Sequence, residues 1–215
     1  MSWETALDNR IHDYLPDLKW VENEPMAKHT SFRIGGPARR MAFPKTREQL
    51  VVLMGFLQDA GVKPLLIGNG TNLLVSDEGL DTVVIDTSAE LSRLDLTGDG
   101  EITADAGVSL ATLAVFAWKN GLKGLAFAHG IPGTLGGGIV MNAGAYGGEL
   151  KDVVTEVTAL YPDGVKALTP AQLDFSYRHS VFSAGEGIVL GAKLKLETGD
   201  KDAIKAEMDE LMARR

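Results

Sequence analysis

Glycine is concentrated in one part of the chain: eight of the nineteen residues from 130 to 148 are glycine. Glycine reaches backbone dihedral angles that are closed to other residues, but it loses more entropy on folding and fills no packing volume. The stretch has neither a collagen-like period nor the low complexity of a linker. We therefore expect its glycines to serve tight turns, close helix–sheet contacts, or the approach of the backbone to an anionic ligand.

Composition excludes several classes of function. The chain has 215 residues, enough for one domain or two small ones. Its formal net charge of −8 argues against a nucleic-acid partner, because phosphate binding needs a basic face. The absence of cysteine excludes disulfides and thiolate metal sites, and the four histidines lack metal-ligand spacing. Without a signal peptide or a membrane-length apolar run, we expect a soluble cytoplasmic protein with no membrane partner and no metal.

The strongest helix signal follows Thr46. Thr46 and Gln49 match a capping box, and Gly61 supplies a stop. A short strand precedes the helix, and residues 62–68 form another, which together are typical of a βαβ unit of about 30 residues. Residues 68–72, GNGTN, would then follow the carboxyl end of a strand, where α/β sheets usually bind ligands. The apolar positions of the helix are Leu50, Leu53, Met54 and Leu57.

The rest of the chain alternates strands and helices. Ser109 predicts the N-cap of a helix that ends at residues 120–121, and residues 153–169 predict a hairpin around Pro-Asp-Gly. The pattern is α+β with two sheet-containing lobes that divide near residues 87–100. Further strands are expected at residues 81–86, 101–107 and 187–197, and an amphipathic helix at 200–215 with Ile204, Met208, Leu211 and Met212 on one face.

Neither common nucleotide motif is present. The chain has no G-x-x-x-x-G-K-[ST] and no G-x-G-x-x-G, so a Walker loop and a Rossmann fingerprint are both unsupported. Residues 68–72 and 130–138 could still expose backbone N–H groups to a pyrophosphate, as a backbone nest does. Tight turns and close packing explain either loop about equally well when it is taken singly.

Four stretches together resemble one family. They are HTSFRIGGPA (29–38), LLIGNGTNLLVSD (65–77), GIPGTLGGGIVMNAGAYGGEL (130–150) and FSYRHSVF (175–182). In this order the chain resembles the UDP-N-acetylenolpyruvoylglucosamine reductases, flavoenzymes of peptidoglycan precursor synthesis. The resemblance implies the α+β, two-lobed FAD-binding fold of the p-cresol methylhydroxylase / vanillyl-alcohol oxidase type, with FAD between the lobes.

The resemblance also implies roles for particular residues. Arg178 would be catalytic and would bind substrate together with Tyr177, because a guanidinium suits the enolate that hydride addition to an enolpyruvyl group creates. FAD would be non-covalent and NADPH the co-substrate, with a UDP-sugar as substrate; for His129 a packing role is favoured over flavin attachment. The implied cofactor-binding residues are Gly68, Asn69, Gly70, Thr71, Asn72, Leu73, Gly107, Gly130, Ile131, Pro132, Gly133, Thr134, Gly136, Gly137, Asn142, Ala143, Gly144, Ala145 and Ile188.

The expected domain plan has three parts. Residues 1–32 would be an N-terminal segment, 33–198 the FAD-binding domain with lobes of about 33–90 and 91–198, and 199–215 a helix leading to an absent substrate-binding domain. In the family a further domain supplies the serine that donates the proton and a glutamate. We therefore assign no proton donor within these 215 residues. Ala126 stands where the family often has glutamate. Two alternatives stay open: a flavin oxidase on the same fold, and a non-catalytic FAD-binding module.

Overall fold

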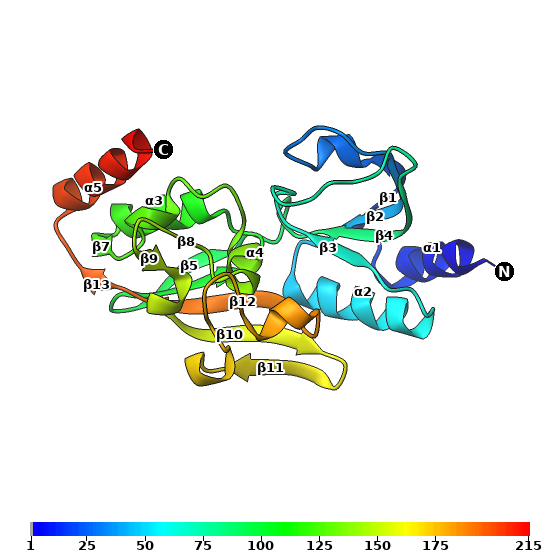
Figure 1. The fold of residues 1–215 in the computed structure, drawn as a ribbon. Coiled ribbons are helices and arrows are strands. Elements are labelled where there is room, and N and C mark those ends of the chain that lie inside the picture. The colour runs from blue at the N-terminus through cyan, green and yellow to red at the C-terminus, as the bar shows by residue number, and fades with distance from the viewer. Residues whose placement is uncertain (1) are drawn as a thin grey trace. The chain divides into compact units, whose positions relative to one another are not determined.

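The chain forms two compact units, Met1–Leu91 and Ser92–Arg215. The structure is a computed structural model that describes residues 2–215 (Figure 1). Each unit contains its own sheet, so each is described by itself.

The first unit is built on a four-stranded mixed sheet in the order β1-β2-β4-β3. β1 and β2 are antiparallel, whereas β4 runs parallel to both β2 and β3. The expected βαβ unit is present, with β4 inserted between its two strands. The elements are α1 (Trp3–Tyr14), β1 (Lys19–Pro25), η1 (Met26–Lys28), β2 (Pro37–Phe43), α2 (Arg47–Asp59), β3 (Leu65–Ile67) and β4 (Leu80–Asp86).

The two helices of this unit pack on each other beside the sheet (Figure 1). The Arg10 guanidinium of α1 lies 4.1 Å from the centroid of the Phe56 ring of α2. Asp8 ties α1 to the sheet, because it accepts hydrogen bonds from Arg40 Nη2 at 2.7 Å and from Trp20 Nε1 at 2.7 Å. The core cluster contains Met26, Ala38, Met41, Phe43, Ile67, Val75 and Val84.

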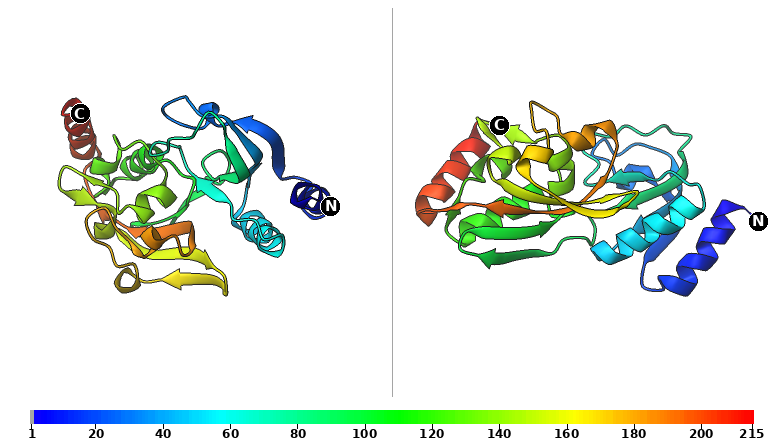
Figure 2. Two further views of the ribbon diagram at one scale, coloured as in Figure 1. Left: turned by 45° about the vertical axis from the view of Figure 1, so that its right-hand side comes forward. Right: turned by 90° about the horizontal axis from the view of Figure 1, so that it is seen from below.

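The second unit is built on a five-stranded sheet in the order β11-β10-β12-β6-β5, with every pair antiparallel. Figure 2 shows these strands running side by side. The expected hairpin is β10 and β11. The strands are β5 (Leu94–Gly98), β6 (Glu101–Asp105), β7 (Leu122–Lys123), β8 (Gly144–Ala145), β9 (Gly148–Glu149), β10 (Val154–Tyr161), β11 (Gly164–Leu168), β12 (Ile188–Lys195) and β13 (Glu197–Thr198).

Helices cover this sheet and its end. α4 packs on β12 and β6, while α5 lies against α3 (Figure 1). Trp118 Nε1 of α3 donates a hydrogen bond to the Lys201 carbonyl at the start of α5, at 3.0 Å. The helices are α3 (Leu110–Lys119), η2 (Ala126–Ala128), α4 (Leu135–Val140), η3 (Leu150–Asp152), η4 (Pro170–Gln172), η5 (Val181–Ala184) and α5 (Lys201–Ala213).

Most local signals are confirmed, with differences of detail. Thr46 and Ser109 cap their helices as expected, by accepting from Gln49 N and Thr112 N. The capping box after Thr46 is incomplete, since the Gln49 side chain accepts from Lys45 N instead. On α5, Ile204 and Met208 are buried and Leu211 is half-buried, but Met212 is 44% exposed. The sequence did not predict α1, nor the helix α4 inside the glycine-rich block.

Candidate functional site

The first glycine loop follows β3 in the first unit. It comprises residues 68–73, and its central Gly70 has φ +59, a left-handed conformation that favours glycine. The N–H groups of Gly68, Asn69 and Asn72 donate to no acceptor within residues 2–215. Unused N–H groups on a loop at the carboxyl end of a parallel strand are what an anionic ligand needs.

Residues 29–36 brace this loop. A Cβ on Gly70 would lie 1.9 Å from the His29 carbonyl oxygen, and a Cβ on Gly36 would lie 2.2 Å from the Asp77 carbonyl oxygen. Ser31 N also donates to the Gly70 carbonyl at 3.1 Å. Residues 29–31 are therefore fitted against the GNGTN loop, and Gly36 packs against the backbone that follows it at residue 77, roles that sequence reasoning did not give them.

In the second glycine stretch, residues 130–138, several glycines allow close packing of helix α4. Thr134 caps α4 by accepting from Gly137 N at 3.4 Å. A Cβ on Gly136 would lie 2.9 Å from Ala106 Cβ, and one on Gly138 would lie 2.9 Å from Leu150 Cδ1. Gly136 N donates to the Ala106 carbonyl at 2.8 Å. The close-packing interpretation thus explains these glycines of α4 without a ligand, while residues 130–133 precede the helix as a loop.

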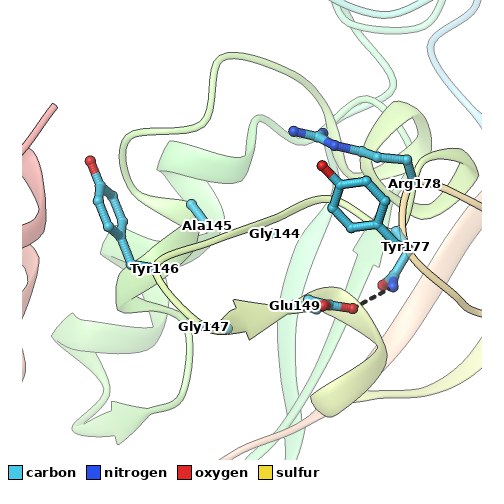
Figure 3. Close-up of a pocket in the computed structure, with 9 residues that line it drawn as sticks. Gly144, Ala145, Tyr146, Gly147, Glu149, Tyr177 and Arg178 are labelled. Atoms are coloured by element: carbon cyan, nitrogen blue, oxygen red, sulfur yellow. Dashed lines mark hydrogen bonds between the residues drawn. The ribbon is translucent and has the colours of Figure 1, made fainter.

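One cavity of about 240 Å³ opens on the second unit. The β8–β9 hairpin, with Tyr146 and Gly147 at its tip, forms one wall, and Tyr177 and Arg178 form the other (Figure 3). Asn142, Gly144 and Ala145 also line it, so the structure brings three expected cofactor-binding residues together with both expected substrate-binding residues. Residues 130–137 do not line it.

Arg178 is carried on a tight turn. Ser176 and His179 close the turn with two backbone hydrogen bonds of 3.2 Å, and Arg178 has φ +55. Both Arg178 and the adjacent Tyr177, which is 86% exposed, are accessible to solvent at the wall of the cavity. Within residues 2–215 the Arg178 guanidinium forms no ion pair. A cation without a partner on a constrained turn beside a cavity is available to bind an anionic group.

Asn142 anchors this turn to the hairpin. Its Nδ2 donates to Glu149 Oε2 at 2.7 Å and to the Ser176 carbonyl at 3.0 Å. Its Oδ1 accepts from Lys151 N at 3.0 Å. The side chain is buried and φ is +41, which asparagine tolerates better than most residues. Both amide hydrogens are therefore used within the protein.

Glu149, the acidic residue that lines the cavity, forms an ion pair with Lys151. Glu149 Oε2 lies 2.7 Å from Lys151 Nζ. The hydrogen bond from Lys151, followed by that from Asn142, holds the pKa of Glu149 below its usual range. Arg178 is therefore the uncompensated charge of the cavity. Sequence reasoning missed Tyr146 and Glu149; the two glycines after Tyr146, typical of a tight turn, were the available signal.

The remaining expected residues lie elsewhere in the second unit. Gly107 follows β6, and Ile188 begins β12, where it pairs with Leu160. Ala143 is buried and its N–H donates to the Gly138 carbonyl. His129 Nδ1 is buried with no hydrogen-bond partner in the described part of the chain. Such an orphaned nitrogen costs stability unless a bound group supplies a partner.

Comparison with known proteins identifies the family to which this chain belongs. The family described as FAD binding domain matches residues 38–167, so the chain contains an FAD-binding domain. It is 45% identical over 210 residues to the UDP-N-acetylenolpyruvoylglucosamine reductase of Caldanaerobacter subterraneus subsp. tengcongensis, covering 97% of this chain and 69% of the relative. It is 43% identical over 194 residues to that of Clostridioides difficile, covering 90% and 64%. The chain belongs to the UDP-N-acetylenolpyruvoylglucosamine reductase family and spans about two thirds of the length of these relatives.

Solved structures confirm the fold class. The UDP-N-acetylenolpyruvylglucosamine reductase of Thermus caldophilus superposes with a TM-score of 0.77 at 33% identity, covering 92% of this chain and 69% of that one. An alkyldihydroxyacetonephosphate synthase superposes with a TM-score of 0.66 at 18% identity, covering 90% and 40%, which is a likeness of fold alone. The α+β FAD-binding fold of the p-cresol methylhydroxylase / vanillyl-alcohol oxidase type is thus confirmed.

Residues 2–215 show no sign of a metal site or of a membrane-spanning helix. They contain no group of three or more His, Asp or Glu side chains placed to hold a metal ion. None of their helices is both long and apolar enough to cross a membrane.

Proposed function

We propose that this chain carries the flavin and substrate-carboxylate contacts of an NADPH-dependent reductase that converts UDP-N-acetylglucosamine-enolpyruvate to UDP-N-acetylmuramate. The relatives named for this activity support it, one of them at 45% identity. The observation that carries it is Arg178, an unpaired cation on a constrained turn at the edge of a cavity. A chain without cysteine suits the reducing cytoplasm, where we place the reaction.

The chemistry of the first loop suits FAD. Gly68, Asn69 and Asn72 offer backbone N–H groups that no acceptor within residues 2–215 uses, and a pyrophosphate supplies acceptors for them. The braced backbone around Gly70 keeps these donors in one arrangement before a ligand arrives, which lowers the entropy cost of binding. FAD, when bound, accepts a hydride from NADPH and delivers it to the substrate.

Arg178 supplies the electrostatic part of the reaction. The enolpyruvyl group carries a carboxylate, which the planar guanidinium can bind through two parallel hydrogen bonds. Hydride addition at C3 develops negative charge at C2 and on this carboxylate, so a fixed cation favours the transition state over the ground state. Tyr177 lies next to Arg178 and is proposed to bind the same substrate (Figure 3).

An anaerobic titration of the 215-residue chain with NADPH, followed by visible absorbance, tests this function. We expect the yellow protein to bleach with NADPH and to regain its colour when UDP-N-acetylglucosamine-enolpyruvate is added. Bleaching without recovery would contradict the proposed second half-reaction for this chain. Rapid recovery with oxygen and no preference for NADPH would indicate an oxidase instead, and a colourless protein that takes up no FAD would overturn the cofactor assignment.

A further inference from the structure

His29 is a half-buried ionisable residue to which the proposed chemistry gives no role. Its side chain is 15% exposed, with Nδ1 at 3.2 Å from Asp86 Oδ2 and Nε2 at 3.1 Å from Glu24 Oε1. An ionised carboxylate can only accept hydrogen bonds, so both bonds require a hydrogen on both ring nitrogens. The ring therefore bridges two carboxylates, and it can donate to both at once only with a hydrogen on each nitrogen.

Both carboxylates accept further hydrogen bonds. Asp86 Oδ1 accepts from Ser88 N at 2.8 Å and from Ser88 Oγ at 2.6 Å. Burial raises the pKa of Glu24, but hydrogen bonds from His29 and from Lys28, whose Nζ is 3.3 Å away, outweigh it and hold that pKa below its usual range. The bridge thus joins β1, through Glu24, to the carboxyl end of β4.

The other neighbour of the His29 ring is the apolar ring of Phe43, and the next charged group, Lys19, lies against that ring. The Phe43 ring of β2 lies 5.6 Å from the His29 ring, centroid to centroid, and Lys19 Nζ lies 4.1 Å from the Phe43 centroid. The charged and titratable groups around His29 are therefore Glu24, Lys28 and Asp86, with Lys19 beyond the phenyl ring.

The bridge continues into the glycine loop. The His29 carbonyl oxygen fills the place where a Gly70 Cβ would stand, 1.9 Å from it. Asp86 pairs with Ile67, the last residue of β3 before the loop. His29 thereby touches the loop through its backbone and the strand that feeds the loop through Asp86.

We propose that His29 is a positioning residue for FAD binding: its charged bridge between Glu24 and Asp86 holds the backbone of residues 29–31 against Gly70 and keeps residues 68–73 in the phosphate-binding conformation. This inference rests on the proposed function, because it assigns the loop to FAD. Loss of the proton, or of the ring, leaves the loop in that conformation for a smaller fraction of the time, and the apparent FAD affinity falls by that fraction.

The test compares His29→Gln with His12→Gln, a matched control at an exposed histidine whose carboxylate contact is to its neighbour Asp13. We expect His29→Gln to raise the FAD dissociation constant about tenfold or more. Without FAD, amide hydrogen exchange over residues 68–75 should speed up in His29→Gln, while helix α2 (Arg47–Asp59) exchanges as before. His12→Gln should match the wild type in both measurements.

The pH profile separates positioning from a purely structural role. An ordinary imidazole titrates near about pH 6.5. The wild-type and His12→Gln proteins should bind FAD more weakly at alkaline pH than at acidic pH, and His29→Gln should lack that slope. Unchanged FAD affinity and loop exchange in His29→Gln, or a slope that persists in it, would overturn the inference.

Two further controls keep the outcomes distinct. If His29→Gln does not fold, Glu24→Gln replaces it: this variant keeps an acceptor for Nε2–H but removes the charge, and a wild-type affinity and pH slope in it would overturn the inference. If the wild type takes up no FAD, the proposed function fails, and the exchange comparison still decides whether His29 fixes the loop.

Discussion

Gly70→Ala should disable the first loop through two separable effects. The new Cβ must adopt a left-handed backbone at φ +59, which costs about 1–2 kcal/mol. It would also stand 1.9 Å from the His29 carbonyl oxygen, below the 3.0 Å at which neighbours must shift. Forcing backbone apart in a packed site costs a further 1–3 kcal/mol or so. We expect the free energy of unfolding to fall by about 2–5 kcal/mol, since the two costs add.

Two glycines of the same unit separate these effects. Gly61 has φ +66 with nothing within 4 Å of its ideal Cβ, so Gly61→Ala should cost only the left-handed term of about 1–2 kcal/mol. Gly55 lies exposed inside α2 with nothing within 4 Å, so Gly55→Ala should stabilise by up to about 1 kcal/mol.

Urea unfolding followed by circular dichroism measures the stabilities, and quenching of flavin fluorescence measures FAD affinity. Gly70→Ala alone should lose FAD binding, by about tenfold or more, because it displaces the braced loop. If Gly70→Ala matches Gly61→Ala in both stability and FAD affinity, the steric argument is refuted.

Three further predictions concern other parts of the chain. Arg178→Lys should slow reoxidation of the reduced flavin by the enolpyruvyl substrate about 100-fold with FAD affinity unchanged, in stopped-flow absorbance, and an unchanged rate would remove Arg178 from the chemistry. Asn142→Asp keeps the shape but loses both donors, to Glu149 and to the Ser176 carbonyl. Tryptic cleavage after Arg178, mapped by mass spectrometry, should therefore accelerate, and an unchanged cleavage rate would contradict the anchoring role. Hydrogen bonds from Arg40 hold the pKa of Asp8 below its usual range, so this pair stabilises the fold above about pH 4 and the contribution is lost as pH falls through the lowered pKa. Asp8→Asn should flatten that acid limb in urea titrations, and an unchanged limb would refute the assignment.

Local chemistry made much of the fold predictable. Thr46 and Ser109 cap helices because each places a hydroxyl oxygen where it can accept from an otherwise unpaired N–H group of the first helical turn. The hairpin of β10 and β11 is likewise encoded by its turn. By contrast, α4 contains three consecutive glycines, so its helix comes from packing and from the Thr134 cap and not from propensity.

The site was less predictable because its contacts join residues distant in sequence. Asn142 bonds to Ser176 across 34 positions, and His29 bonds to Asp86 across 57. The resemblance made Asn142 an expected cofactor-binding residue, whereas both of its amide hydrogens are used by the protein. Likewise, the composition around Gly136 is equally compatible with a ligand cradle and with a close helix contact, and only the neighbouring atoms distinguish them.

An equilibrium titration of the purified 215-residue chain with FAD, followed by quenching of flavin fluorescence, tests the central claim most directly. The account predicts saturable binding of one FAD per chain, and markedly weaker binding by Gly70→Ala than by Gly61→Ala. Absence of saturable binding by the wild-type chain would contradict it.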